Sequence, residues 1–162
     1  MNANKQDFFD HFKEKYISFM PQELLSFFTP EDLDSFLGRR LDFVRQRQEG
    51  ELKIHINSNH AQEWQTNKTV VEILYEDMNF LVDSLREYFT RKGYELIWVV
   101  HPNFALERDP RSGELISIQH GDKLESYIYL ELSHISSEQE KELEKDLREI
   151  YDEIGLAVQS FQ

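Results

Sequence analysis

The chain has 162 residues, of which 40% are hydrophobic and 13% aromatic, and its formal net charge is −13. This length fits one domain with a core of its own, and the apolar content is too high for a disordered acidic tail. The negative charge argues against a nucleic-acid partner or an anionic membrane surface. A sequence without cysteine has no disulfide, thiolate metal site or cysteine nucleophile.

The longest uninterrupted apolar run, residues 96–100, is far too short to span a membrane. Residues 1–10 mix charged and aromatic side chains and lead into no apolar segment of the kind that a secretory signal contains. We therefore expect an acidic, cytoplasmic domain that binds neither nucleic acid nor membranes.

The first third of the chain reads as helix. Aromatic residues at spacings of three and four predict an amphipathic helix over residues 5–20, followed by a short turn over 22–28. Thr29 as cap and Pro30 at the first helical position predict a further helix, which Gly50 closes. These aromatic helices either dock on another chain or domain or cover this domain's own sheet, and we favour the second alternative.

The remaining two-thirds alternates strands with two helices. Apolar alternation and β-branched residues predict strands over residues 52–57, 69–75, 94–101, 104–108, 114–118 and 127–134. Asp77 offers a cap for the first helix, and Gly93 ends it. Pro102 interrupts the third strand and bends the chain, because proline donates no ladder hydrogen bond. Ser137 and Glu140 have the capping-box spacing at the start of the last helix, whose apolar stripe continues to positions 158 and 161.

This order predicts an α+β fold, with one antiparallel sheet carrying two helices on one face in the ferredoxin-like arrangement. The strand at 52–57 takes the place of the missing last strand by pairing with 69–75. The chain accordingly divides into a helical N-terminal segment, residues 1–49, and an α+β domain, residues 50–162.

The sequence contains no pattern that points to catalysis, cofactor binding or metal binding. No two of its six glycines lie closer than eight residues, which excludes Rossmann and P-loop phosphate loops. The histidines are scattered, and His55 and His60 need not converge on one ion. No Gly-x-Ser-x-Gly elbow occurs either. We therefore assign no catalytic, cofactor-binding or metal-binding residue.

Glu76, Asp77 and Asp83 surround the start of the first helix of the α+β domain. Together they are able to hold an ammonium group or to supply a general base. As ordinary structure they are a cap, a complement to the helix dipole and an exposed acid, which is the interpretation that we favour.

Several stretches resemble the N-terminal region of the large bacterial NAD-specific glutamate dehydrogenases. They are Thr69-Val70-Val71-Glu72-Ile73, the run from Glu76 to Ser84, Trp64, His101-Pro102, Arg108-Asp109 with Gly113, Glu125-Ser126 and Pro30-Glu31-Asp32-Leu33. The resemblance implies an ACT-like domain at the front of a much longer enzyme that oxidises glutamate to 2-oxoglutarate with NAD. The NAD site and the catalytic lysine of that family belong to a downstream domain and have no counterpart among these residues.

The resemblance also implies partners: the remaining domains of a longer chain, further copies in a homo-oligomer, and an amino-acid effector. ACT domains that bind amino acids often carry an Asp-x-Pro-Gly-Leu turn, where this sequence reads Asp77-Met78-Asn79-Phe80-Leu81 and lacks both Pro and Gly. Asp77, Met78, Asn79 and Asp83 are thus the candidate effector or interface turn, with a purely architectural role as the alternative. A stand-alone amino-acid sensor and an interaction module using the aromatic helices are the competing functions.

Overall fold

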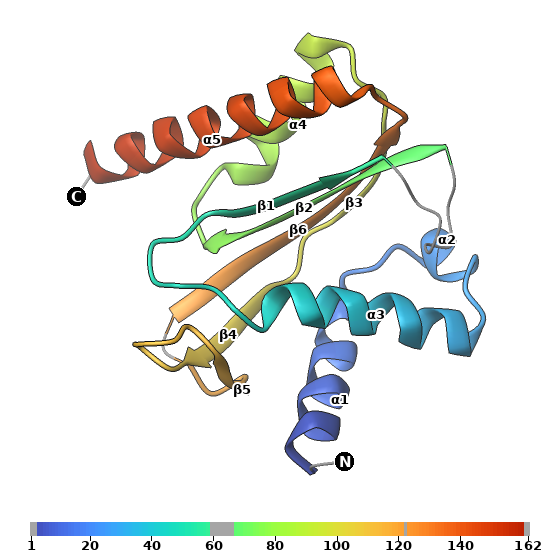
Figure 1. The fold of residues 1–162 in the computed structure, drawn as a ribbon, viewed down its shortest axis with the longest axis vertical. Coiled ribbons are helices and arrows are strands. Elements are labelled where there is room, and N and C mark those ends of the chain that lie inside the picture. Colours follow the sequence, from blue (N-terminus) through green and yellow to red (C-terminus); the bar gives the residue numbers. More distant parts are fainter. Residues whose placement is uncertain (1–2, 59–66, 122, 161–162) are drawn as a thin grey trace.

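The computed structural model describes residues 3–58, 67–121 and 123–160 (Figure 1). Three helices come first: α1 (Ala3–Ser18), α2 (Gln22–Leu25) and α3 (Pro30–Val44). The rest follows in the order β1 (Lys53–Asn57), β2 (Lys68–Glu76), α4 (Leu81–Lys92), β3 (Leu96–Val100), β4 (Asn103–Arg108), β5 (Leu115–Ile118), β6 (Lys123–Ser133) and α5 (Ser137–Ser160).

The strands form one antiparallel sheet in the order β1-β2-β6-β4-β5, and β3 pairs with β6 on the same side as β4. β2 and β6 are the two central strands, in register from Lys68↔Ser133 to Glu76↔Glu125. β1 pairs with the free edge of β2, for example Ile54↔Ile73. This is the ferredoxin-like strand order with β1 in place of the last strand, which confirms the predicted fold.

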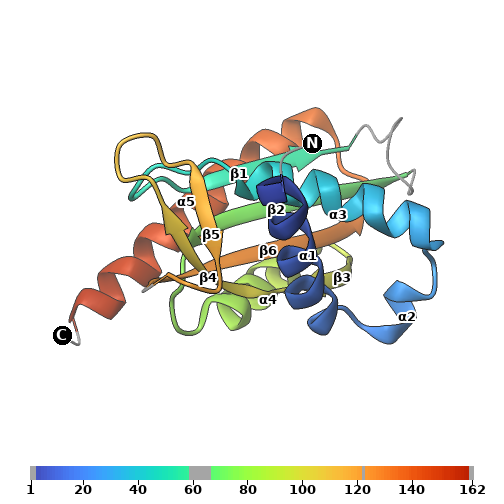
Figure 2. The same ribbon diagram turned by 90° about the horizontal axis from the view of Figure 1, so that it is seen from below.

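Helices cover both faces of the sheet (Figure 1). α4 and α5 lie on one face, where residues such as Ile73, Ile128 and Leu143 form an apolar core. α1 and α3 lie across the other face, where Phe12 and Tyr16 are fully buried in a second core with strand residues (Figure 2). The aromatic residues of the N-terminal helices therefore mainly cover this domain's own sheet, which is the alternative that we favoured.

Several local predictions are confirmed in detail. The Thr29 hydroxyl accepts a hydrogen bond from the Asp32 amide at 3.1 Å, and Pro30 is the first residue of α3. Gly93 ends α4 with φ of 75°, a conformation that favours glycine. β3 stops before His101 and β4 starts after Pro102, so the ladder is interrupted at the position predicted from the proline.

The predicted cap at Asp77 is wrong. Its amide donates to the Leu124 carbonyl at 3.1 Å, so the chain is still tied to the start of β6 at this point. A turn must follow before the helix begins, and the cap position of α4 falls on Phe80, which is left-handed with φ of 66° and makes no side-chain cap bond.

The predicted capping box at Ser137 and Glu140 is wrong by one residue. The Ile135 amide donates to the Thr69 hydroxyl at 3.0 Å and keeps the chain extended up to that point. Ser136 becomes the cap: its hydroxyl accepts from the Gln139 amide, and the Gln139 side chain accepts from the Ser136 amide. The side chains of the last two stripe positions, 158 and 161, lie outside the described part of the chain.

Candidate functional site

The predicted effector or interface turn lies between β2 and α4. Asp77, Asn79 and Asp83 are exposed and Met78 is half-buried. Neither Asp77 nor Asp83 forms an ion pair within the described ranges, and Asp83 stands in the first turn of α4, where the helix dipole favours a carboxylate. Phe80 projects into solvent with 76% of its surface exposed. The structure brings these residues to one end of α4, and their role in binding stays a prediction.

A serine and a histidine lie near this turn, and no local sequence pattern pairs them. The His101 imidazole is hydrogen-bonded to the Ser126 hydroxyl. Burial lowers the pKa of His101, and the nearby Asp77 carboxylate opposes this effect only in part. Only 2% of the Ser126 surface is exposed, so a substrate has no access to its hydroxyl. The group therefore lacks what a Ser-His-Asp nucleophile needs and fastens the bend between β3 and β4 to β6.

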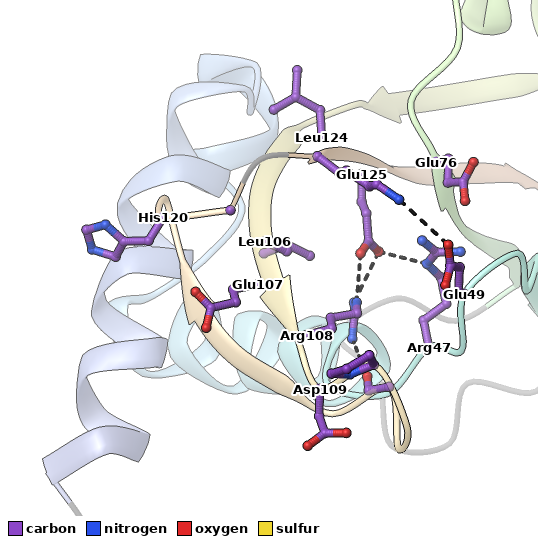
Figure 3. A pocket seen from close by; sticks show the side chains of 14 residues that line it. Arg47, Glu49, Glu76, Leu106, Glu107, Arg108, Asp109, His120, Leu124 and Glu125 are labelled. Atoms are coloured by element: carbon purple, nitrogen blue, oxygen red, sulfur yellow. Dashed lines mark hydrogen bonds and ion pairs between the residues drawn. The ribbon is translucent and has the colours of Figure 1, made fainter.

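A cavity with a volume of about 410 Å³ lies on the opposite face of the sheet (Figure 3). Its walls come from the segment after α3, the end of β2, the β4–β5 hairpin and the start of β6. Charged side chains of both signs line it, among them Arg47, Glu76, Arg108 and Glu125. Its size lies within the range of small-molecule sites.

Two arginines share one carboxylate in the wall of this cavity. Arg47 Nε lies 2.8 Å from Glu125 Oε1, and Arg108 Nε lies 2.7 Å from Oε2 (Figure 3). Burial by itself would raise the pKa of Glu125, but the hydrogen bonds from Arg108 and Arg47 hold it below its usual value. We call these three residues the arginine node; it carries one excess positive charge.

The arginine node also has a structural task. Arg108 Nη2 donates to the Val44 carbonyl at 2.6 Å and Nη1 to the Gly113 carbonyl at 2.9 Å, so it caps the end of α3 and ties it to the hairpin. Gly113 is left-handed with φ of 78°, and a Cβ there would lie 2.4 Å from the Arg47 carbonyl oxygen. Only glycine permits this close approach.

A second buried ion pair lies deeper between the sheet and α3. Arg40 Nε is 3.2 Å from Glu72 Oε2, and the Tyr127 hydroxyl donates to the same carboxylate at 2.7 Å. Burial by itself would raise the pKa of Glu72, but Arg40 and the hydrogen bonds from His55 and Tyr127 lower it overall. Both charged residues are almost fully buried, and neither lines the cavity.

Two further kinds of feature would point to function in the described ranges, a cluster of metal ligands and a membrane-spanning helix. No group of three or more His, Cys, Asp or Glu residues is placed there to hold an ion. His55 lies 3.4 Å from Glu72, and His60 falls outside the described residues. Across the same ranges, no helix combines the length and apolar character that crossing a bilayer requires.

The fold is that of an α+β module, and the walls of its cavity contain paired charges. Comparison with known proteins adds the family: a match to the glutamate dehydrogenase ACT1 domain covers residues 12–147, and the chain belongs to this family. No solved structure matches it.

Two similar proteins are NAD-specific glutamate dehydrogenases. The one from Pseudomonas aeruginosa is 29% identical over 163 aligned residues, which cover 93% of this chain and 10% of that protein. The one from Halomonas elongata is 29% identical over 154, covering 83% of this chain and 10% of its own length. The chain thus spans about one tenth of the length of these relatives.

Proposed function

We propose that the chain is an N-terminal regulatory and assembly domain of an NAD-dependent glutamate dehydrogenase and is itself non-catalytic. The observation that carries this proposal is the family match over residues 12–147. Together with relatives ten times its length, it favours a part of a longer chain over a stand-alone sensor. The full enzyme would convert glutamate and NAD to 2-oxoglutarate, ammonium and NADH in the cytoplasm, with NAD bound by other domains.

The chemistry of the described residues supports a non-catalytic role. The arginines beside the cavity are engaged with Glu125 and with backbone carbonyls. The serine that has a histidine partner is buried in the sheet. A regulatory or assembly domain needs a stable scaffold that presents surfaces to other domains or to further copies in a homo-oligomer. The sheet, with helices packed on both of its faces, is such a scaffold.

Burial weighs against a module that binds partners through its aromatic helices. Phe12, Tyr16 and Phe36 are at most 3% exposed, and they pack against aromatic rings of the sheet: Phe12 stacks on Phe104, and Phe36 meets Tyr129 edge to face. A partner would have to displace a core in order to reach them.

The test compares the isolated chain with the full-length enzyme and with an enzyme that lacks this domain. We expect no glutamate-dependent NADH formation by the isolated chain, as measured by absorbance. Removing the domain should alter the subunit count, measured by light scattering, or the response of the enzyme to effectors. Turnover by the isolated chain, or a truncated enzyme that assembles and responds like the whole, would contradict the proposal.

A further inference from the structure

A carboxylate without a cationic partner is buried under the N-terminal helices, at Glu131 near the end of β6. Only 1% of this residue is exposed. Its Oε2 accepts a hydrogen bond from the Tyr129 hydroxyl at 3.0 Å, whereas Oε1 has no hydrogen-bond partner among the described residues. The other two carboxylates buried on this face, Glu72 and Glu125, both lie against arginines. Because an ionised carboxylate is costly to bury without a cation, the closed structure favours the protonated form of Glu131.

The charged groups around Glu131 do not supply the missing cation. Ionisable side chains from the elements packed around it act on Glu131 or on its hydrogen-bond donor: Tyr16 of α1, Arg40 of α3 and Lys68 of β2. Arg40 forms its ion pair with Glu72. β3 contributes Trp98, the Cα partner of Glu131, which carries no charge. Burial raises the pKa of Glu131, and the Tyr129 hydroxyl and Lys68 offset this effect only in part.

The cover over this corner of the sheet is thin. Trp98 packs against the same core as α1 and α3, and the Phe27 ring meets it edge to face at 6.4 Å. Phe27 follows α2, which has only four residues and no side-chain cap bond at its start. A helix this short is held by its tertiary contacts and not by its own stability. The segment around α2 is therefore the part of the cover that opens at the lowest free energy.

We propose that Glu131 is a pH-sensitive latch for the N-terminal layer, which consists of α1, α2 and α3. The layer is closed while Glu131 carries a proton, and it opens locally between α2 and β3 when the proton is lost, because water then reaches the carboxylate. The raised pKa sets the direction: the contribution of Glu131 is complete below the ordinary glutamate pKa and is lost as pH rises through the raised value. The latch is a property of this chain and does not rest on the proposed function.

The test measures amide hydrogen exchange of the chain by NMR, residue by residue, between about pH 5.5 and about pH 7.5. After correction for the intrinsic exchange rate, we expect protection in the N-terminal layer to fall at least about fivefold over this range, with the largest decrease around Phe27. Release of one proton changes an opening equilibrium by at most about tenfold per pH unit. Protection in α5, on the other face of the sheet, should change by less than about twofold.

Glu131→Gln separates the latch from other titrating groups. The amide resembles the protonated acid and does not ionise, so the pH dependence of protection in the N-terminal layer should disappear. Glu107→Gln, at an exposed glutamate of β4, is the matched control and should keep it. Histidines titrate in the same range, and His55 lies 3.4 Å from Glu72. Since both variants retain His55, the difference between them isolates the contribution of Glu131.

Tyr129→Phe is an independent variant that leaves Glu131 in place. It removes the one hydrogen bond to the carboxylate, which favours the ionised form, so the midpoint of the pH dependence should move to higher pH. A structural role of this tyrosine alone would lower protection equally at every pH.

The proposal is overturned if protection in the N-terminal layer does not fall with pH, or if the fall persists in Glu131→Gln. It is overturned equally if α5 loses as much protection as α1 to α3, because the whole domain would then respond and not the layer. None of these outcomes bears on the proposed function, whose test is the subunit count and effector response of the full-length enzyme.

Discussion

The two faces of the sheet are both covered by helices, but they bury different chemistry. The face under α4 and α5 is packed with apolar side chains such as Val71, Ile73 and Leu130. The face under α1 and α3 buries three carboxylates, Glu72, Glu125 and Glu131, each at most 5% exposed. One face is thus an ordinary hydrophobic interface, and the other depends on charge compensation.

The compensating charges come largely from the N-terminal segment. Arg40 in α3 meets Glu72, and Arg47, just after α3, meets Glu125. The N-terminal segment therefore does more than cover apolar surface, because it supplies cations that offset the cost of burying the strand carboxylates. The first two helices add aromatic contacts to the same core.

The largest expected effect follows from cutting the chain at the predicted boundary. Residues 50–162 alone would lose Arg40 and Arg47 and expose the whole apolar surface of one face, so we expect loss of cooperative folding. The natural margin of about 5–15 kcal/mol does not cover such a loss. Dispersed NMR amide signals and a cooperative urea transition for the fragment would instead show that residues 1–49 form a dispensable layer.

Breaking the ion pair between Arg40 and Glu72 tests, at a single contact, whether the α1/α3 face depends on charge compensation. Arg40→Met leaves the Glu72 carboxylate buried without its guanidinium, so we expect a loss of about 3–5 kcal/mol in the free energy of unfolding, measured in urea. The double variant Arg40→Met with Glu72→Gln removes the charge as well and should recover most of this loss. If both variants lost the same amount, packing of the arginine on Phe36 and Tyr129 would be the cause instead.

The third carboxylate of this face behaves in the opposite way. Burial raises the pKa of Glu131, and the hydrogen bond from the Tyr129 hydroxyl offsets this effect only in part. Because the pKa is raised in the folded state, the contribution of Glu131 to stability is complete below the unfolded pKa. It is lost as pH rises through the folded pKa. Glu72 and Glu125 have lowered values, so their contribution is present above the unfolded pKa and is lost as pH falls through the folded one.

Glu131→Gln therefore tests whether the stability contribution of this glutamate, unlike that of Glu72 and Glu125, is lost as pH rises. The neutral amide imitates the protonated acid, so we expect a gain of about 1 kcal/mol at neutral pH and little change at about pH 4. Urea denaturation at both pH values measures it. Glu107→Gln, at an exposed glutamate, is the control and should alter stability similarly at both. A gain from Glu131→Gln that persisted at acid pH would contradict a protonation-linked origin.

Much of the fold was predictable because its signals are local. Alternation identified β1, a run of β-branched residues identified β2, and the proline at position 102 located the bend between β3 and β4. Helix periodicity identified the buried stripes of α4 and α5. The errors fall where a distant strand decides the outcome: pairing with β6 holds Asp77, and Thr69 holds Ile135, so both helices begin later or are capped differently than their local sequence suggests.

The candidate site was predictable only in part. The turn at Asp77 was located from a contiguous motif, but the cavity is assembled from four separate segments. The partners of Glu125 lie 17 and 78 residues away in the chain, and no local pattern pairs them. In a sequence with 31 acidic residues, nothing marks Glu76 or Glu125 until the register of β2 and β6 is known.

The smallest expected effect concerns the turn itself, on the apolar side of the sheet. Phe80 adopts a left-handed conformation with φ of 66°, and the residue is 76% exposed. A left-handed conformation costs a residue with a Cβ about 1 kcal/mol, and little burial is lost when this side chain is removed. Phe80→Gly should therefore stabilise the domain by about 0.5–1 kcal/mol in urea. Phe80→Ala keeps the Cβ and the strain, so it should change little; equal gains from both variants would assign the effect to the exposed ring and leave the backbone unstrained.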